Sequence, residues 1–338
     1  MFVQTNDLTG NQILVYDRAG DGTLTLAETV DTEGAGGKND GSGPDPLTSQ
    51  GSLVYDPHHR VLIAVNAGSN TVSVLGLEDE HLRLRQVLAS GGSFPVSVTV
   101  HGNLLYALNA HDGGAITGYR IIGNQFHPIE DSTRPLGLTP ATGPTQFLNT
   151  PAQIGFTPDG QHLVITTKAN GSLIDVFTMQ TDGRPSNTFA ASPAATPTPF
   201  GFTFDDHAHL VVADAATSTL TTDTIHSDGT AKQLFSQPDG QQGMCWIAHA
   251  AGNFYVADNG SDTITGYHID SAGTPTVFTR ANTREGPIDL TGTPDGQLLY
   301  VEIGTTGGVD SYRVKPDGIL TPLATLTVPN SAEGIAVS

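Results

Sequence analysis

Cysteine, positive charge and long apolar runs are all scarce in this 338-residue sequence. The single cysteine, Cys245, excludes an internal disulfide, and its place in the apolar run MCWIA favours a small buried residue over a nucleophile. No run approaches the roughly 18 apolar residues that a membrane-spanning helix requires. Apolar spacing of three and four is also not sustained over about ten residues anywhere, which argues against a helical protein.

The charge balance excludes two classes of partner. Lysine and arginine together number 14, against 34 aspartates and glutamates, which gives a formal net charge of −20. Nucleic acids and anionic membrane surfaces select clusters of Lys and Arg, and the few in this chain are scattered. We therefore expect neither nucleic acid nor a membrane as a partner, and we expect a monomeric protein.

The N-terminal residues fit either a cytoplasmic or an exported protein. Met1 runs directly into a strand-like segment without a signal peptide, as in a cytoplasmic protein or in one whose leader has been replaced by an initiator methionine. Sparse lysine with abundant Thr, Asn and Gly is typical of exported bacterial proteins. We therefore favour a periplasmic or secreted bacterial protein over a cytoplasmic one.

Turn-forming residues, by contrast, are abundant, with 40 glycines and 21 prolines. Residues 50–77 form the clearest unit, in which three runs rich in Val, Leu and Ile are separated by the turns DPHHR and NAGSNT. Short runs bounded by Asp, Pro, Asn and Gly are typical of antiparallel strands joined by tight turns. A sheet this small buries its faces only by stacking on copies of itself.

Copies of this unit fill the chain. The polar residues that end the second runs are spaced by 43, 58, 47, 44 and 44 residues: Asn66, Asn109, Thr167, Asp214, Asp258 and Glu302. A period in the mid-forties with four strand-sized runs predicts a β-propeller. The N-terminal segment supplies three more runs and the C-terminal AEGIAVS supplies one. We therefore expect an all-β fold, a seven-bladed propeller of four-stranded antiparallel blades in one domain, 1–338, whose C-terminus provides the innermost strand of the blade that begins the chain.

The long connections between blades, at 31–49, 125–150 and 190–199, are predicted to emerge on the same face as the ends of the second strands. We call this the loop-rich face. Most histidines fall in turns of the opposite face, where solvation is favoured over metal binding. His111 is the one histidine expected on the loop-rich face.

Acidic residues gather on this face in the predicted fold. Equivalent blade positions converge on the mouth of the central channel, and three consecutive second strands end in an acid. We therefore expect six carboxylates and two cations around one side of the mouth: Asp214, Asp258, Glu285, Asp289, Glu302 and Glu333, with Arg284 and Lys168. Carboxylates so placed repel one another, which requires a bound cation, a raised pKa or a neighbouring arginine.

Three interpretations of these residues stay open. Carboxylate oxygens suit Ca²⁺ or Mg²⁺, with Asp258 and Glu302 as candidate metal ligands. A carboxylic acid beside an ionised partner suits general acid–base catalysis; the candidate catalytic residues are then Glu285, Glu302 and Asp258, and the candidate substrate-binding residues are Arg284, Lys168, Asp214, Asp289, Glu333 and His111. Alternatively, the second-strand residues hydrogen-bond their own turns. No motif requires a cofactor, and no GxSxG, HExxH or CxxC pattern is present.

The TPDG turns, the segment NAGSNTVSV and the run PAQIGFTPDGQHLVITTKANGSLIDVF together carry a resemblance. The chain resembles the bacterial seven-bladed propeller lactonases, whose relatives include propeller-type 6-phosphogluconolactonase and the fungal carboxy-muconate cyclase. The resemblance implies the propeller fold and a lactonase-type activity. The family's His, Arg and Glu are not matched, because the corresponding places read Ala152-Gln153-Ile154, Thr198-Pro199-Phe200-Gly201 and Asp214-Ala215. Loss of the Arg–His pair argues against a phosphorylated substrate.

Two functions follow, and the sequence leaves open whether the protein is an enzyme. The first is a lactonase-like hydrolase or cyclase that acts on a small lactone or sugar acid at the channel mouth, where Arg284 would hold a carboxylate and Glu285 or Glu302 would activate water. The second is a non-catalytic propeller that binds a divalent cation, a glycan or a protein partner through the same acidic face. Propellers host many unrelated functions, so the fold does not decide between them.

Overall fold

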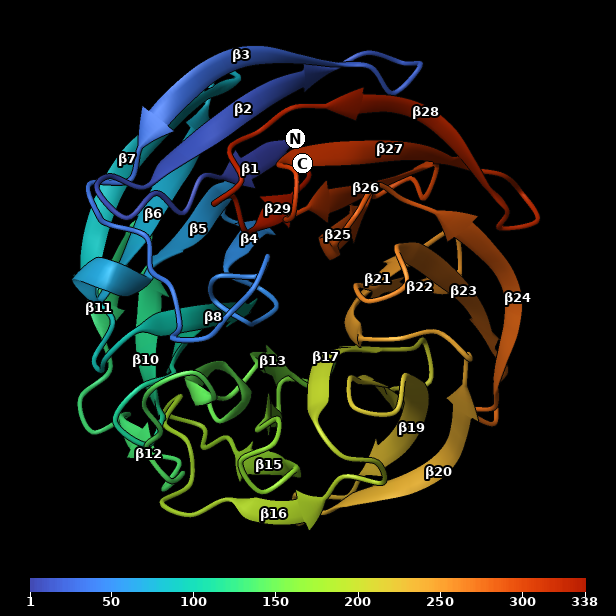
Figure 1. Ribbon diagram of the computed structural model, residues 1–338. Helices are drawn as coiled ribbons and strands as arrows, with labels where there is room; N and C mark the ends of the chain where they lie inside the picture. The colour runs from blue at the N-terminus through green and yellow to red at the C-terminus, as the bar shows by residue number, and fades with distance from the viewer.

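A ring of seven antiparallel sheets makes up this protein (Figure 1). The computed structural model describes residues 1–338. Its sheets are the blades of a propeller, so the predicted all-β, seven-bladed fold is confirmed. Helix is confined to two 3₁₀ turns, η1 Ala67–Ser69 and η2 Gln146–Leu148, and neither is long and apolar enough to cross a membrane. We number the blades 1 to 7, starting with the blade that follows the first long connection.

The blades follow the chain, each from its innermost to its outermost strand. Blade 1 comprises β4 Leu53–Asp56, β5 Val61–Asn66, β6 Thr71–Glu78 and β7 His81–Ala89. Blade 2 comprises β8 Pro95–His101, β9 Leu104–Asn109, β10 Ala115–Ile122 and β11 Gln125–Pro128, and the short β12 Arg134–Pro135 also pairs with β10. Blade 3 comprises β13 Gln153–Phe156, β14 His162–Thr166, β15 Leu173–Thr178 and β16 Ala190–Pro193.

The next three blades repeat this order. Blade 4 comprises β17 Pro199–Phe204, β18 Leu210–Asp214, β19 Thr219–Ile225 and β20 Ala231–Pro238. Blade 5 comprises β21 Met244–Ala250, β22 Asn253–Asp258, β23 Thr263–Ile269 and β24 Pro275–Asn282. Blade 6 comprises β25 Pro287–Gly292, β26 Leu298–Ile303, β27 Gly308–Val314 and β28 Leu320–Leu326.

Blade 7 closes the ring with both ends of the chain. It comprises β29 Ile335–Ala336, β1 Phe2–Gln4, β2 Gln12–Arg18 and β3 Leu24–Asp31, in that order. The register pairs Phe2 with Ala336 and Val3 with Ile335. Figure 1 shows the two termini side by side within this blade. The predicted closure is therefore confirmed, and it completes the four strands of this blade with one from the far end of the chain.

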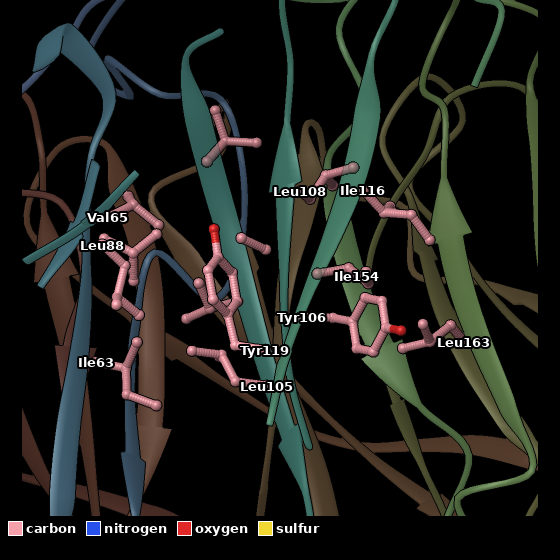
Figure 2. Close-up of a cluster of buried hydrophobic side chains, with 14 of the residues drawn as sticks. Ile63, Val65, Leu88, Leu105, Tyr106, Leu108, Ile116, Tyr119, Ile154 and Leu163 are labelled. Atoms are coloured by element: carbon pink, nitrogen blue, oxygen red, sulfur yellow. The ribbon is translucent and has the colours of Figure 1, made fainter. Parts of the chain in front are cut away.

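Apolar side chains pack between neighbouring blades rather than within one. The largest buried cluster contains 26 residues and draws on strands of blades 1, 2 and 3 (Figure 2). Two tyrosines of blade 2 extend in opposite directions: Tyr106 donates its hydroxyl to Gly183 O of blade 3 at 2.6 Å, and Tyr119 donates to Ala89 O of blade 1. Because each blade buries its faces against two neighbours, removal of one blade exposes both contacts.

Candidate functional site

Residues 45–50, which we call the plug, cross the central channel on the loop-rich face. Ser49 Oγ donates to Val96 O in blade 2 at 2.8 Å, and Trp246 Nε1 in blade 5 donates to Ser49 O at 2.9 Å. The Gln50 side chain makes two further hydrogen bonds to the blade 5 backbone, of 2.7 and 3.0 Å. Figure 1 shows the connection between β3 and β4 reaching in toward the ring centre. The first long connection is thus anchored to distant blades.

Two carboxyl groups meet where the plug passes the C-terminal strand. The buried side chains of Asp45 and Glu333 lie close enough that each shifts the pKa of the other, which favours one shared proton for the pair. Asp45 Oδ1 accepts a hydrogen bond from Thr48 N at 2.6 Å, and Glu333 Oε2 accepts one from Leu47 N at 2.6 Å. Burial and the charge of Asp45 raise the pKa of Glu333 well above its usual value. Burial also raises the pKa of Asp45, but Glu333 and nearby Lys168 oppose that rise, so we assign the proton to Glu333.

Two other acids lie against the same C-terminal strand. Glu302 Oε2 accepts a hydrogen bond from Gly334 N at 2.9 Å, and Asp289 Oδ2 accepts one from Ile335 N at 3.3 Å. Burial and the charge of Asp289 raise the pKa of Glu302 well above its usual value, and burial raises that of Asp289 to about 7. The structure thus brings together three of the six expected acids and one that was not expected. We call this set the carboxyl cluster: Asp45, Asp289, Glu302 and Glu333.

Lys168 is the cation that lies beside the cluster. Its Nζ donates to Thr48 O at 2.7 Å, to Thr48 Oγ1 at 3.0 Å and to Thr150 Oγ1 at 2.8 Å, and it lies 5.5 Å from the centre of the Phe200 ring. Burial lowers the pKa of Lys168 to about 7, against the attraction of Asp45. Lys168 therefore holds the plug in place and partly offsets the charge of the cluster.

A cavity of about 170 Å³, which we call the mouth cavity, is bordered by the cluster's Asp45. Side chains from the plug and from blades 3, 4 and 5 line it, among them Asp45, Lys168, Phe200, Ala215, Cys245 and Trp246. The Phe200 and Trp246 rings lie 5.2 Å apart at 67°. Burial raises the pKa of the Cys245 thiol, so this residue is protonated at neutral pH. The walls are therefore apolar and aromatic, with one carboxylate and one ammonium group.

Two of the three segments at which the lactonase resemblance implies catalytic side chains border the same cavity, whereas Gln153 and Ile154 of the third line a different one. Thr198, Phe200 and Ala215 line the mouth cavity, and Ala152 belongs to the buried cluster that also contains Phe200 and Trp246. At these places the chain carries hydroxyl, aromatic and methyl groups where the resemblance implies His, Arg and Glu.

A second and larger cavity lies on the other side of the plug. This far channel has a volume of about 560 Å³ and is lined by the innermost strands. Among its lining side chains are Leu53, Val98, Ile154, Phe202, Leu290 and Ile335. Asp289, at the bulge in β25 where its φ is +33°, is the one acidic side chain in its walls. The far channel therefore has walls of mixed polarity and opens to the face opposite the loops.

Asp214 and Asp258 do not join the carboxyl cluster. Asp214 accepts a hydrogen bond from Thr221 Oγ1 at 3.0 Å, and Asp258 accepts one from Thr265 Oγ1 at 2.8 Å. Neither residue lines the mouth cavity or the far channel. Burial raises the pKa of each carboxyl group to about 8, and nearby Asp239 contributes at Asp258. The expectation that these acids share one mouth with Glu302 is therefore corrected.

The hydrogen bonds of Asp214 and Asp258 recur at the equivalent position of another blade. Asn66 Nδ2 donates to Ser73 Oγ at 2.8 Å, and Asn66 Oδ1 accepts from Thr32 Oγ1 at 2.7 Å, in the connection from the preceding blade. In all three blades the partner hydroxyl lies seven residues after the polar residue, on the third strand. Glu302 departs from this pattern because Val309 stands at the corresponding position. The side chains of Asn66, Asp214 and Asp258 thus tie the second strand to the third strand of their own blades, and Asn66 also binds the connection from the preceding blade.

The remaining candidates lie apart from the cluster. Arg284 Nε donates to Asp310 Oδ1 at 2.7 Å, so its charge is committed to β27 and does not neutralise the cluster. Glu285 is exposed. His111 stacks on Phe94 with ring centres 4.0 Å apart, and burial lowers its pKa. No three His, Cys, Asp or Glu side chains converge in a way that could hold a metal ion, and Asp258 and Glu302, the suggested ligands, belong to different blades.

Sequence reasoning missed Asp45 and Trp246. Asp45 lies in GPDPLTS, whose abundance of turn formers indicates a loop but not its path across the ring. Trp246 falls in MCWIA, which reads as a core strand. The apolar residues Pro46 and Leu47 inside a polar loop were the available signal, because a solvated loop has little reason to carry Leu47, which is fully buried.

Comparison with known proteins gives structural neighbours but no sequence relatives. No protein-family model matches the chain, and no curated protein matches it. A solved structure from Bacteroides uniformis, proposed to be a 6-phosphogluconolactonase, superposes with a TM-score of 0.73 at 19% identity, covering 94% of this chain and 92% of the other. The periplasmic gluconolactonase of Pseudomonas aeruginosa superposes with a TM-score of 0.73 at 16% identity, covering 96% and 95%.

Proteins of other function share the architecture. Hydrazine synthase of Kuenenia stuttgartiensis superposes with a TM-score of 0.59 at 14% identity, covering 90% of this chain and 89% of the other. At such identities the likeness concerns the fold and leaves the chemistry open. The chain therefore has the seven-bladed propeller fold found in gluconolactonases, as the sequence resemblance implied.

Proposed function

We propose that this protein is a lactonase-like hydrolase that acts on a small lactone at the mouth cavity. The proposal rests on the buried pair of Asp45 and Glu333 next to Lys168. Asp45 and Lys168 line the mouth cavity, and Glu333 lies behind Asp45. A carboxylate, a protonated partner and a cation are the groups that ester hydrolysis needs for proton transfer and charge stabilisation. The gluconolactonase neighbours support the same reaction class through the shared fold.

Asp45 is the general base in this proposal. Its carboxylate takes a proton from a water molecule as the water oxygen attacks the lactone carbonyl carbon. The Lys168 ammonium group, whose three protons are directed at Thr48 and Thr150, offsets the negative charge on the carbonyl oxygen of the tetrahedral intermediate through space, without a hydrogen bond to it. The ring C–O bond then breaks, the proton passes from Asp45 to the leaving alkoxide, and the product is a hydroxy acid. Glu333 keeps the proton that the pair shares.

The protonation states define a pH range for the reaction. Because the pKa of Lys168 is lowered to about 7, the rate is expected to fall as pH rises above that value and the ammonium loses its proton. At acid pH the rate falls as Asp45 gains a proton. We also propose an extracytoplasmic location, which the periplasmic neighbour supports.

A panel of aliphatic and aldonic lactones tests the activity. We expect Asp45→Asn to lower kcat/KM by about 100-fold or more, because the amide cannot accept the proton of water. Asp175→Asn is the matched control: this buried aspartate also has a pKa raised to about 7 by burial, but it lies in β15, outside the mouth cavity. The control is expected to keep the wild-type rate.

The residues that the sequence singled out belong in the same assay. Glu302→Gln, Glu285→Gln and Asp258→Asn test them one at a time. A loss of activity in one of these variants with Asp45→Asn still active would overturn the assignment of the base. Absence of turnover with every lactone in the wild type would remove the proposed function itself.

A further inference from the structure

We infer that the mouth cavity is built for a small, neutral, largely apolar lactone, and that a polyhydroxylated sugar lactone is a poor ligand. The inference rests on the proposed function for the reaction, but its basis is separate: it is the state of the polar groups in the cavity wall.

The side-chain nitrogen donors among those polar groups already have partners within the protein. Trp246 Nε1 donates to Ser49 O, and all three protons of a charged Lys168 Nζ are directed at Thr48 and Thr150. Asn259 Nδ2 donates to Pro287 O at 3.2 Å. Few donors are therefore free for the hydroxyl groups of a ligand.

The rest of the wall is apolar. Phe147, Leu148, Phe200, Ala215 and Cys245 join Trp246 around the cavity. The cavity volume of about 170 Å³ is close to that of the roughly 150 Å³ apolar cavity that holds one benzene molecule. A single ring therefore fits. Each ligand hydroxyl buried here without a partner lowers the affinity by about tenfold.

The charges in the cavity wall also favour a neutral ligand. The cation of the cavity, Lys168, faces Asp45 and is saturated by threonine oxygens, so an anionic ligand finds no free positive group. Asp45 itself repels an anion. A neutral ester avoids both costs, and its carbonyl oxygen is the one acceptor that the site has to accommodate.

Two lactones that differ only in hydroxyl groups test this inference. δ-Hexalactone has the carbon skeleton and ring of glucono-1,5-lactone but lacks its four hydroxyl groups. Trp246 is the only tryptophan of the chain and lies in the cavity wall, so its fluorescence reports on this cavity alone. We expect δ-hexalactone to change this fluorescence with a Kd about 100-fold or more below that of the gluconolactone.

Two variants that fill the cavity serve as controls. Cys245→Leu and Ala215→Val add methyl groups to the wall, and either one is expected to abolish the fluorescence response with little change in Tm. Equal or tighter binding of the gluconolactone, or no response to δ-hexalactone, would overturn the inference. Binding of δ-hexalactone without hydrolysis would retain it and remove the proposed function. Turnover of the gluconolactone alone would retain the function and overturn the inference.

Discussion

Deletion of residues 330–338 is expected to destroy the cooperative fold of the ring. This segment contributes β29, and Ile335, 4% exposed, packs between blades 6 and 7. Without it β1 becomes an open edge, and Glu302 and Asp289 lose the backbone donors of Gly334 and Ile335. The lost burial and the orphaned acids together are expected to cost about 5 kcal/mol or more, which is comparable with the whole stability of many proteins.

Circular dichroism melting and gel filtration measure this effect. The truncated chain is expected to aggregate, or to melt at least about 10 °C below the full-length chain. Deletion of the exposed Ser338 alone is the control and is expected to leave Tm unchanged. A truncated chain that stays soluble and melts like the full-length protein would show that the C-terminal strand is not needed to close the ring.

Stability is expected to fall as pH rises from about 4 to about 7, because the carboxyl cluster holds protons that the unfolded chain releases. Asp289 has a pKa raised to about 7, and those of Glu302 and Glu333 are raised well above normal, whereas unfolded Asp and Glu titrate near 4. Each such carboxyl lowers the free energy of unfolding by about 1.4 kcal/mol per pH unit across that window. Below about pH 4 these carboxyl groups are protonated in both the folded and the unfolded protein, so they no longer lower the free energy of unfolding.

Lys168 works in the opposite direction at higher pH. Its folded pKa of about 7 lies below the value near 10.4 of an unfolded lysine, so stability partly recovers as pH rises above 7. Urea titrations at pH 5 and pH 7.5 measure the balance, and we expect the free energy of unfolding to be higher at pH 5 by about 3 kcal/mol or more. Glu302→Gln and Glu333→Gln cannot ionise and are expected to flatten this dependence. Equal or lower stability at pH 5 would contradict the protonation states assigned to the cluster.

The fold could be predicted from the sequence because its determinants are local and repeated. Runs such as Val61–Asn66 carry the strand pattern, the turns between them carry Gly, Asn and Asp, and the period of the repeat gives the number of blades. Ring closure could also be predicted, because AEGIAVS is a first strand without a blade of its own. Only long-range packing was left for the structure to supply.

The site was harder to predict because its residues are positioned by contacts that no repeat records. Equivalence along the repeat correctly placed Asp214 and Asp258 at the ends of second strands, but not the direction of their side chains. That direction is set by the hydroxyls of Thr221 and Thr265, which hold both carboxyls against the third strand of their own blade. Asp45 reaches the mouth through a long loop whose path depends on Trp246, Lys168 and other residues far away in the chain.

Phe200 and Ala215 line the mouth cavity at positions where the resemblance to propeller lactonases implies polar catalytic groups. The gluconolactonase-like architecture is kept, while the chemistry is proposed to move to the plug and the C-terminal strand. Asp45 and Glu333 are separated by 288 positions in the sequence. Closure of the ring brings their side chains together. Stability of the ring and integrity of the site are therefore linked.

A crystal of the protein soaked with δ-hexalactone would show directly where the lactone binds. We expect ligand density in the mouth cavity, against Phe200 and Trp246, with the carbonyl carbon facing Asp45. Ligand density in the far channel beside Asp289, or on the exposed surface at Glu285, would contradict this expectation.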